Sequence, residues 1–153
     1  MTTTAVHVRH ARASDAPAIT ACVCAAYLHY IERIGRQPEP MLHDYDEVIR
    51  YSQVHVATSA GRIVGAIVLK RTDEGFCIDN VAVHPDVQRS GVGTRLMDLA
   101  EREARRQGHE SVYLCTHELM TENRAIYARR GFREYDRRVV EGYARVFFRK
   151  TLK

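Results

Sequence analysis

Two glycines stand where a helix is about to begin, at Gly91 and Gly93 within the stretch DVQRSGVGTR of residues 86–95. The first turn of a helix carries N–H groups without intrahelical acceptors and a partial positive charge, so it attracts anions. Glycine lets a ligand approach the backbone closely. Arg89 adds positive charge and Thr94 adds a hydroxyl. Residues 88–94 therefore predict a binding site for phosphate oxygens.

The spacing of this loop excludes the two common nucleotide-binding motifs. A Walker loop requires a lysine directly after its last glycine, and Thr94 follows Gly93 here. A dinucleotide fingerprint requires a third glycine, where this chain has Leu96. Taken alone, the loop leaves two interpretations open: an anion site, or a turn that only needs glycine in a left-handed conformation.

The elements around the loop predict an α/β fold. Helices are expected within residues 13–34, in a short segment before residue 50, from Thr94 to Gln107 and within residues 120–132. Strands are expected at residues 6–10, on both sides of the turn at 59–62, at 76–83 and 111–116, and on both sides of Glu141-Gly142. Strand-helix-strand units need crossovers whereas hairpins pair antiparallel, so we expect a mixed central β-sheet with helices on both faces.

Length and composition predict one globular domain spanning residues 1–153. There is no apolar run of membrane-spanning length and no signal-peptide pattern at the N-terminus, so we expect a cytoplasmic protein with no membrane partner. The four cysteines lack paired metal-binding spacing, and no histidine spacing suggests a metal site. We therefore expect reduced thiols and no metal.

The net charge of +4 raises the question of a nucleic-acid partner. The arginines run from Arg9 to Arg149 and alternate with carboxylates, which indicates solvated helix faces rather than a phosphate-binding track. We expect no nucleic-acid partner. A basic surface also suits an anionic phosphorylated ligand.

The stretch NVAVHPDVQRSGVGTRLM, residues 80–97, resembles the acyl-CoA-binding motif of the GCN5-related N-acetyltransferase (GNAT) family. The signature is Gln or Arg, two residues, Gly, one residue, then Gly or Ala, met here from Gln88 to Gly93. ENRAIYARRGF, residues 122–132, resembles the family's later helix. The order of strands and helices also matches over nearly the whole chain, so the resemblance implies a GNAT-like fold.

The resemblance implies a binding site for acetyl-CoA. In this family the strand before the loop holds the pantetheine arm through its backbone, which would assign this role to Val81, Ala82 and Val83. The loop and helix start hold the pyrophosphate. This role would fall to Gln88, Arg89, Ser90, Gly91, Val92, Gly93 and Thr94, mainly through their amides. Asn123 would contact the cofactor arm, although many relatives place this polar residue at another offset.

The implied chemistry is attack by a neutral amine on the thioester carbonyl, which requires a proton acceptor for the amine and a proton donor for the departing thiolate. Tyr127 matches the position commonly assigned as the donor. No motif fixes a base. Asp79 shares a strand face with Val81 and Val83 by the period of two, His117 and Glu118 follow the next strand, and a water chain remains an alternative.

The acceptor site is expected between the first strand and the second helix, where the family usually places it. Carboxylates and aromatic rings there attract and stack on a cationic amine, so Tyr27, Tyr30, Asp44 and Tyr45, together with His117, are the candidate substrate-binding residues. A proline-rich loop over the core is the competing interpretation of this segment.

The resemblance therefore implies an acetyl-CoA-dependent N-acetyltransferase that acts directly on a primary amine of a small molecule, a peptide or a protein. The alternative is a non-catalytic acyl-CoA-binding or sensing domain. The acceptor is unnamed at this stage. The oligomeric state is open, with a homodimer as one option.

Overall fold

The computed structural model describes residues 5–153, so the first four residues of the N-terminal stretch that shows no signal-peptide pattern lie outside the described part. The strands are β1 (Val6–His10), β2 (Gln53–Ser59), β3 (Arg62–Thr72), β4 (Gly75–Val83), β5 (Ser111–His117), β6 (Arg133–Val140) and β7 (Tyr143–Thr151). The helices are α1 (Ala16–Tyr27), α2 (Tyr30–Ile34), α3 (Tyr45–Tyr51), α4 (Val92–Arg106) and α5 (Thr121–Arg129), with short 3₁₀ turns η1 (Ala13–Asp15), η2 (Glu39–Leu42) and η3 (Pro85–Val87).

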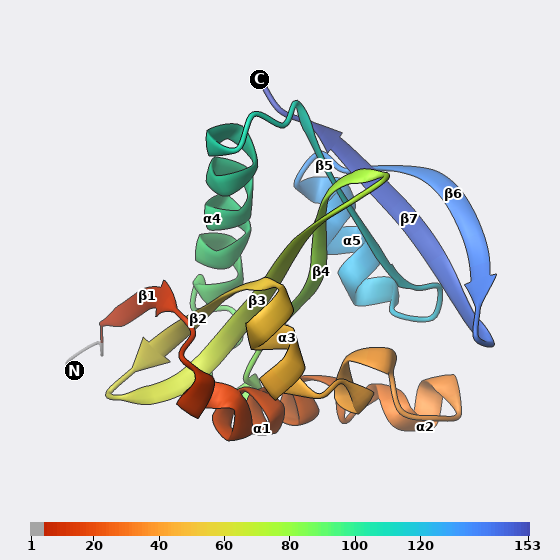
Figure 1. Cartoon of the computed structure of the whole chain (residues 1–153). Coiled ribbons are helices and arrows are strands. Elements are labelled where there is room, and N and C mark those ends of the chain that lie inside the picture. Colours follow the sequence, from red (N-terminus) through yellow and green to blue (C-terminus); the bar gives the residue numbers. More distant parts are fainter. Residues whose placement is uncertain (1–4) are drawn as a thin grey trace.

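The strands form one mixed sheet in the order β1-β2-β3-β4-β5-β7-β6 (Figure 1). Its one parallel pair is β4 with β5, and this pairing covers only Phe76–Ile78 against Val112–Leu114. Every other neighbouring pair is antiparallel. Helix α4 provides the crossover between these two strands, as parallel pairing requires. The predicted α/β fold with a mixed central sheet is confirmed.

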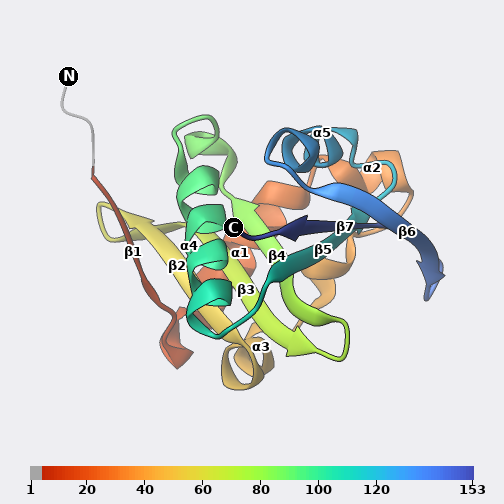
Figure 2. The same ribbon diagram turned by 90° about the horizontal axis from the view of Figure 1, so that it is seen from above.

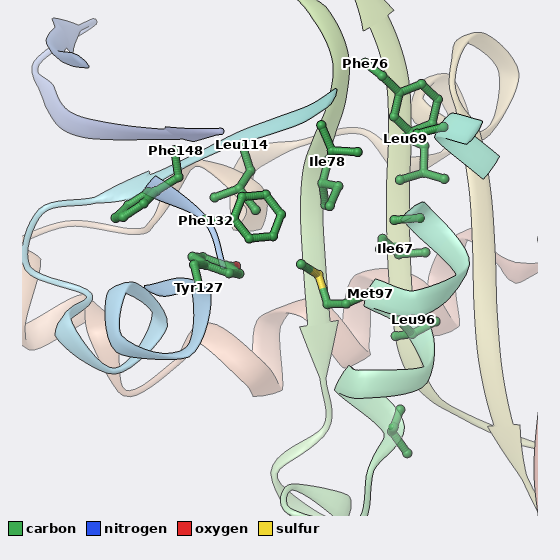
Figure 3. Close-up of a cluster of buried hydrophobic side chains, with 14 of the residues drawn as sticks. Ile67, Leu69, Phe76, Ile78, Leu96, Met97, Leu114, Tyr127, Phe132 and Phe148 are labelled. Carbon is green, nitrogen blue, oxygen red and sulfur yellow. The ribbon is translucent and has the colours of Figure 1, made fainter. Parts of the chain in front are cut away.

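Helices cover both faces of the sheet, as predicted (Figure 2). On one face α4 and α5 contribute Leu96, Met97 and Tyr127 to a cluster with the sheet residues Ile67, Ile78 and Leu114 (Figure 3). On the other face α1 and α3 contribute Ile19, Val23 and Tyr45, which pack on Val56 and Val68. The sheet is therefore the middle layer of three.

Helix α4 forms where its apolar spacing predicts a helix. Val92, Leu96, Ala100 and Ala104 recur every fourth residue and are all buried, whereas charged side chains dominate the other faces. The helix starts two residues before the predicted Thr94, because Gly91 adopts φ +90° and turns the chain into it. It ends at Arg106, one residue before the predicted Gln107.

Gly65 on β3 sets how closely α4 lies on the sheet. A Cβ at this position would stand 2.9 Å from Cγ1 of Val92 and 3.3 Å from the carbonyl oxygen of Ala82. A side chain at this position would therefore push the Val92 side chain, and with it the first turn of α4, away from the sheet. The first turn of α4 therefore rests directly on β3 and β4, and this fixes the position of the glycine loop.

A β-bulge interrupts β4 at Asp79. Leu69 pairs with Ile78 but Val68 pairs with Asn80, so Asp79 has no partner of its own on β3. Phe76 and Ile78 face α4 before the bulge, whereas Val81 and Val83 pack on the same side after it. The period-two argument that placed Asp79 on one face with Val81 and Val83 is therefore wrong, since the extra residue shifts the alternation by one.

The described residues can be compared with the expectations for membrane-spanning segments, cysteines and metal ligands. No helix between residues 5 and 153 is long and apolar enough to cross a membrane. All four cysteines are free thiols; Cys22 and Cys77 are buried, and Cys24 and Cys115 are half-buried. No cluster of three or more metal-ligating side chains lies within residues 5–153.

Candidate active site

A cavity of about 220 Å³ opens where β4 and β5 diverge beyond Ile78 and Leu114. The parallel pairing ends there, so the facing edges of the two strands become free. The cavity is also bordered by α1, α5, β7 and the segment that follows α2. Its chemically active lining residues are Tyr27, Glu39, His43, Lys70, Asp79, Asn80, Cys115, His117, Asn123, Tyr127, Tyr143 and Arg145.

The backbone of β4 offers free polar groups to this cavity. The N–H of His84 donates to the carbonyl oxygen of Val64, which fixes the hydrogen-bonding phase of the β3–β4 ladder. Antiparallel pairing alternates, so Ala82 directs its N–H and C=O toward β3 whereas Val81 and Val83 direct theirs away from it. Ala82, expected to contact the cofactor together with these valines, points its backbone groups at β3 and its side chain into the core.

The predicted glycine loop forms a concave backbone at the N-terminus of α4. Arg89 and Gly91 both have positive φ, at 68° and 90°. The first intrahelical acceptor is the Gly91 carbonyl, which accepts from the N–H of Arg95. Within residues 5–153 the N–H groups of Val92, Gly93 and Thr94 have no backbone acceptor. These amides and the helix dipole suit an anion.

The side chains of the loop contribute little to this surface by contrast. Gln88, Arg89 and Ser90 are exposed, and the Ser90 hydroxyl donates to the carbonyl oxygen of Val87. Val92 is buried in the core, where it anchors the first turn of α4. The loop is therefore a site made chiefly of main-chain groups.

Tyr127 lies at the inner wall of the cavity. Its ring packs on Phe132 and Phe148 with centroid distances of 5.9 and 6.1 Å (Figure 3). Burial raises the pKa of the Tyr127 hydroxyl, so it stays protonated at ordinary pH. Within residues 5–153 this hydroxyl has no hydrogen-bond partner. It is therefore free to donate to a group in the cavity.

Asp79 lies on the cavity wall although the argument that predicted it was wrong. The bulge turns its carboxylate toward the cavity, where it lies 3.1 Å from the ammonium nitrogen of Lys70. The Asp79 side chain is 25% exposed, so water reaches it. Asp79 belongs to the same strand as the N–H groups of Val81 and Val83 that point away from β3.

His117 lies on the opposite wall, at the end of β5. Its Nδ1 accepts a hydrogen bond from the N–H of Leu119, so the proton of the neutral ring is on Nε2. Burial lowers the pKa of His117 below its usual value of 6.5. In this state the ring donates a hydrogen bond through Nε2 and does not accept a proton there. Glu118, the other candidate base on this side, pairs with Arg137 and does not line the cavity.

Of the other residues predicted for the acceptor, Tyr27 lines the cavity and three do not. Tyr30 is buried and donates from its hydroxyl to Glu122. Asp44 is exposed and caps α3 by accepting from the N–H of Asp46. Tyr45 is buried and donates to the carbonyl oxygen of Pro40. Each of these three side chains therefore has a structural partner instead.

Asn80 was missed by the sequence reasoning and is at the centre of a buried polar network. It is 5% exposed, accepts from the Tyr27 hydroxyl at 2.8 Å and donates to the Tyr45 hydroxyl at 3.1 Å. Tyr27 also lies 3.1 Å from the carbonyl oxygen of Val81. The network holds the strand just after the bulge against α1 and α3. No motif marks Asn80, because its partners are about 35 and 53 residues away in the chain.

Part of the segment expected to border the acceptor forms the strap, which we define as residues 30–43; its partners on β7 and α5 were not predicted. It contains α2 and η2 and crosses one side of the cavity, contributing Pro38, Glu39, Pro40 and His43 to the lining. Figure 1 shows α2 below the turn that joins β6 and β7. Arg145 of β7 forms a two-point ion pair with Glu39 of the strap. Asn123 completes this wall from α5, with its amide 3.7 Å from Sδ of Met120.

Comparison with known proteins agrees with this geometry. The family model of the acetyltransferase (GNAT) domain matches residues 50–134, which include β4, the glycine loop, α4 and Tyr127. Because this match covers more than half of the chain, the protein belongs to the GNAT acetyltransferase family. No curated protein sequence matches the chain.

Solved structures of acetyltransferases share the fold. The PaiA N-acetyltransferase from Thermoplasma acidophilum, solved with coenzyme A, has a TM-score of 0.81 at 14% identity over 97% of this chain and 99% of its own. A GCN5-related N-acetyltransferase from Rhodopseudomonas palustris has a TM-score of 0.78 at 24% identity over 99% of both chains. A GNAT acetyltransferase from Elizabethkingia anophelis, with acetyl-CoA bound, has a TM-score of 0.72 at 16% identity over 96% of this chain and 98% of its own.

Proposed function

We propose that this protein transfers the acetyl group of acetyl-CoA directly to a primary amine. The observation that carries the proposal is the joint placement of three features at one cavity. The free N–H groups of α4 attract a pyrophosphate, and the free edge of β4 suits an amide-rich arm. The Tyr127 hydroxyl, at the inner wall, has no partner among the described residues. Residues 1–153 as one domain are part of this proposal.

The donor substrate binds mainly to the backbone in this proposal. The amides from Gln88 to Thr94 hold the pyrophosphate, with Arg89 adding charge from solvent. The N–H groups of Val81 and Val83 hold the pantetheine arm along β4. Asn123 contacts the arm from α5, where it lines the cavity.

The reaction joins the amine nitrogen to the acetyl carbon and breaks the bond between that carbon and sulfur. One proton leaves the nitrogen and one proton is delivered to the sulfur. Tyr127 donates to the departing sulfur, because its raised pKa keeps the hydroxyl protonated. Asp79 accepts the amine proton, directly or through water, since the Nδ1 of His117 is occupied by Leu119 and its Nε2 carries the proton.

Direct transfer is favoured over a covalent acetyl-enzyme. The half-buried Cys115 is the one cysteine that lines the cavity. Burial raises the pKa of the Cys115 thiol to about 11, so almost none of it is thiolate at neutral pH. A neutral thiol is a weak nucleophile, so the amine itself is the attacking group.

Replacement of Tyr127 by Phe tests the proposal. Loss of the proton donor lowers kcat by about a hundredfold while the KM for acetyl-CoA stays within about twofold. The measurement follows free CoA thiol with a panel of amines, and Tyr135→Phe, an exposed tyrosine on β6, is the matched control. Unchanged turnover in Tyr127→Phe across pH removes the donor role. Binding of acetyl-CoA without turnover on any amine supports a sensing domain instead.

A further inference from the structure

The acceptor side of the cavity is closed by contacts between the strap and the β6–β7 hairpin. The Tyr143 hydroxyl donates to the carbonyl oxygen of Gln37 at 2.6 Å. Arg36 donates to the carbonyl oxygen of Glu141 at 2.7 Å, and its guanidinium lies 3.4 Å from the centroid of the Tyr143 ring. Hydrogen bonding and cation–π stacking therefore act on the same short segment.

An ion pair fixes the strap at the next position along the wall. Arg145 donates from Nε to one carboxylate oxygen of Glu39 at 2.9 Å and from a second nitrogen to the other. Both side chains are about three-quarters buried, at 24% exposed each. A two-point pair with this burial has a defined geometry, unlike a single contact at the surface.

The other end of the strap is attached to α5. Tyr30 donates to Glu122 at 2.9 Å, and Arg33 lies 2.9 Å from the same carboxylate. Arg33 also donates to the carbonyl oxygen of Leu119 at 3.1 Å. The strap is therefore attached to elements on both sides of the cavity, and this wall is not an open groove.

The space that remains is small, and the lysine, arginine and carboxylate side chains that line it are paired with one another. The cavity volume of about 220 Å³ is less than the roughly 300–1,000 Å³ typical of sites for drug-sized ligands. The two cations that line it, Lys70 and Arg145, are each paired with one lining carboxylate, Asp79 and Glu39. His117 is uncharged at neutral pH and presents one hydrogen-bond donor.

We infer that the acceptor is a compact primary monoamine with no further charge, and that the strap excludes lysine side chains of proteins and polyamines. The inference rests on the proposed function and deepens it. A lysine in a polypeptide needs a groove for the chain on both sides, and the contacts of Arg36, Tyr143 and Glu39 close that path. A polyamine brings extra positive charges into a cavity whose carboxylates are already paired.

The test compares kcat/KM for aliphatic and aromatic monoamines with kcat/KM for spermidine and for a lysine-containing peptide. The full chain is used, and acetyl-CoA affinity is measured separately by calorimetry. The expected result is a preference of at least about tenfold for the monoamines. Equal or higher kcat/KM for the peptide or for spermidine overturns the inference and leaves the proposed function standing. Bound acetyl-CoA without turnover on any amine overturns both.

A variant separates the strap from the rest of the cavity. Arg36 does not line the cavity, so Arg36→Ala loosens the strap without touching either substrate. The ratio of kcat/KM for monoamine over peptide falls about tenfold, while the Kd for acetyl-CoA stays within about twofold. Arg137→Ala, which removes an arginine paired with Glu134 on β6, is the control and leaves the ratio unchanged. A ratio that does not move in Arg36→Ala overturns the role of the strap.

Discussion

The two sides of the cavity are built from different parts of the polypeptide. On the donor side, β4 and the start of α4 present main-chain N–H groups, and the side chains between Gln88 and Gly91 are exposed. On the acceptor side, the strap presents side chains held by ion pairs and stacking, such as Glu39 with Arg145 and Arg36 with Tyr143. A main-chain site tolerates side-chain changes that preserve its dihedral angles, whereas a side-chain site changes with each substitution. In the proposed function, the donor is thus recognised by backbone geometry and the acceptor by the side chains of particular residues.

The largest expected effect is on the donor side, from Gly91→Glu. The new side chain introduces bulk and like charge at the anion cradle and strains a residue at φ +90°. The Kd for acetyl-CoA rises about a hundredfold, or ~2.7 kcal/mol, measured by calorimetry. Gly108→Glu is the matched control, since Gly108 has φ +85° at the other end of α4 and open space around its Cα. Equal losses in both variants would mean that helix strain and not the cradle causes the effect.

The next effect concerns the packing of α4, which carries the donor site. His55 is 4% exposed, stacks on His10, and contacts Gln53, which donates to Glu103 of α4. Burial lowers the pKa of His55 from 6.5 to about 4. Below pH 6.5 the histidine is therefore protonated in the unfolded state but stays neutral in the folded state. The contribution of His55 to the free energy of unfolding is complete above pH 6.5 and is lost as the pH falls from 6.5 to 4.

Acidification from pH 7.5 to 5 accordingly removes about 2 kcal/mol of the free energy of unfolding through His55 alone. Urea denaturation at the two pH values measures it. His55→Gln reduces the loss by that amount, whereas His7→Gln, an exposed histidine on β1, does not. The same pH dependence in wild type and His55→Gln contradicts this account.

The third effect is on the acceptor side, from Glu39→Gln. The substitution keeps the shape of the side chain and leaves the guanidinium of Arg145, three-quarters buried, without its counter-charge. The KM for the amine rises about tenfold, or ~1.4 kcal/mol, while the Kd for acetyl-CoA is unchanged. Glu134→Gln, which removes a carboxylate that pairs with Arg137 and is more exposed than Glu39, serves as the control. Similar increases in the KM for the amine and in the Kd for acetyl-CoA would contradict the distinction between the two sides.

The smallest effect is again on the donor side, from Thr94→Ala. Its N–H is one of the free amides of α4, and within residues 5–153 its hydroxyl makes no hydrogen bond. Removal of the hydroxyl preserves the amide, so the Kd for acetyl-CoA changes by less than about threefold. Calorimetry under the conditions used for Gly91→Glu gives the comparison. A loss as large as that of Gly91→Glu would show that side chains carry donor binding after all.

The donor side was predictable from sequence because its requirements are local. The glycine at position 91 and the apolar spacing from Val92 to Ala104 lie within about fourteen consecutive residues. The order of the other elements follows from similar local patterns. The bulge at Asp79 was not predictable, because apolar residues continue on both sides of it and conceal the change of phase.

The acceptor side was not predictable for a different reason. Glu39 and Arg145 are 106 residues apart, as are Gln37 and Tyr143. The residues next to each of them in the sequence therefore do not indicate which residue it contacts. Charged residues at such positions look like ordinary surface residues. Asp44 and Tyr45 were predicted to bind the acceptor because a carboxylate stands next to an aromatic ring. In the structure Asp44 caps α3 and Tyr45 belongs to the network around Asn80.

The unpaired residue in β4 also governs which sequence lengths this strand accepts. Removal of Asp79 alone would restore strict alternation without moving any other side chain to the opposite side, because Ile78 already pairs with Leu69 and Asn80 already pairs with Val68. The amide of Asn80 would stay beside Tyr27, and Val81 and Val83 would stay under α4. A deletion of the Asp79 codon would therefore remove a cavity carboxylate and keep the inside and the outside of the strand, whereas deletion of one codon between Asn80 and Val83 would shift the alternation of the residues after it.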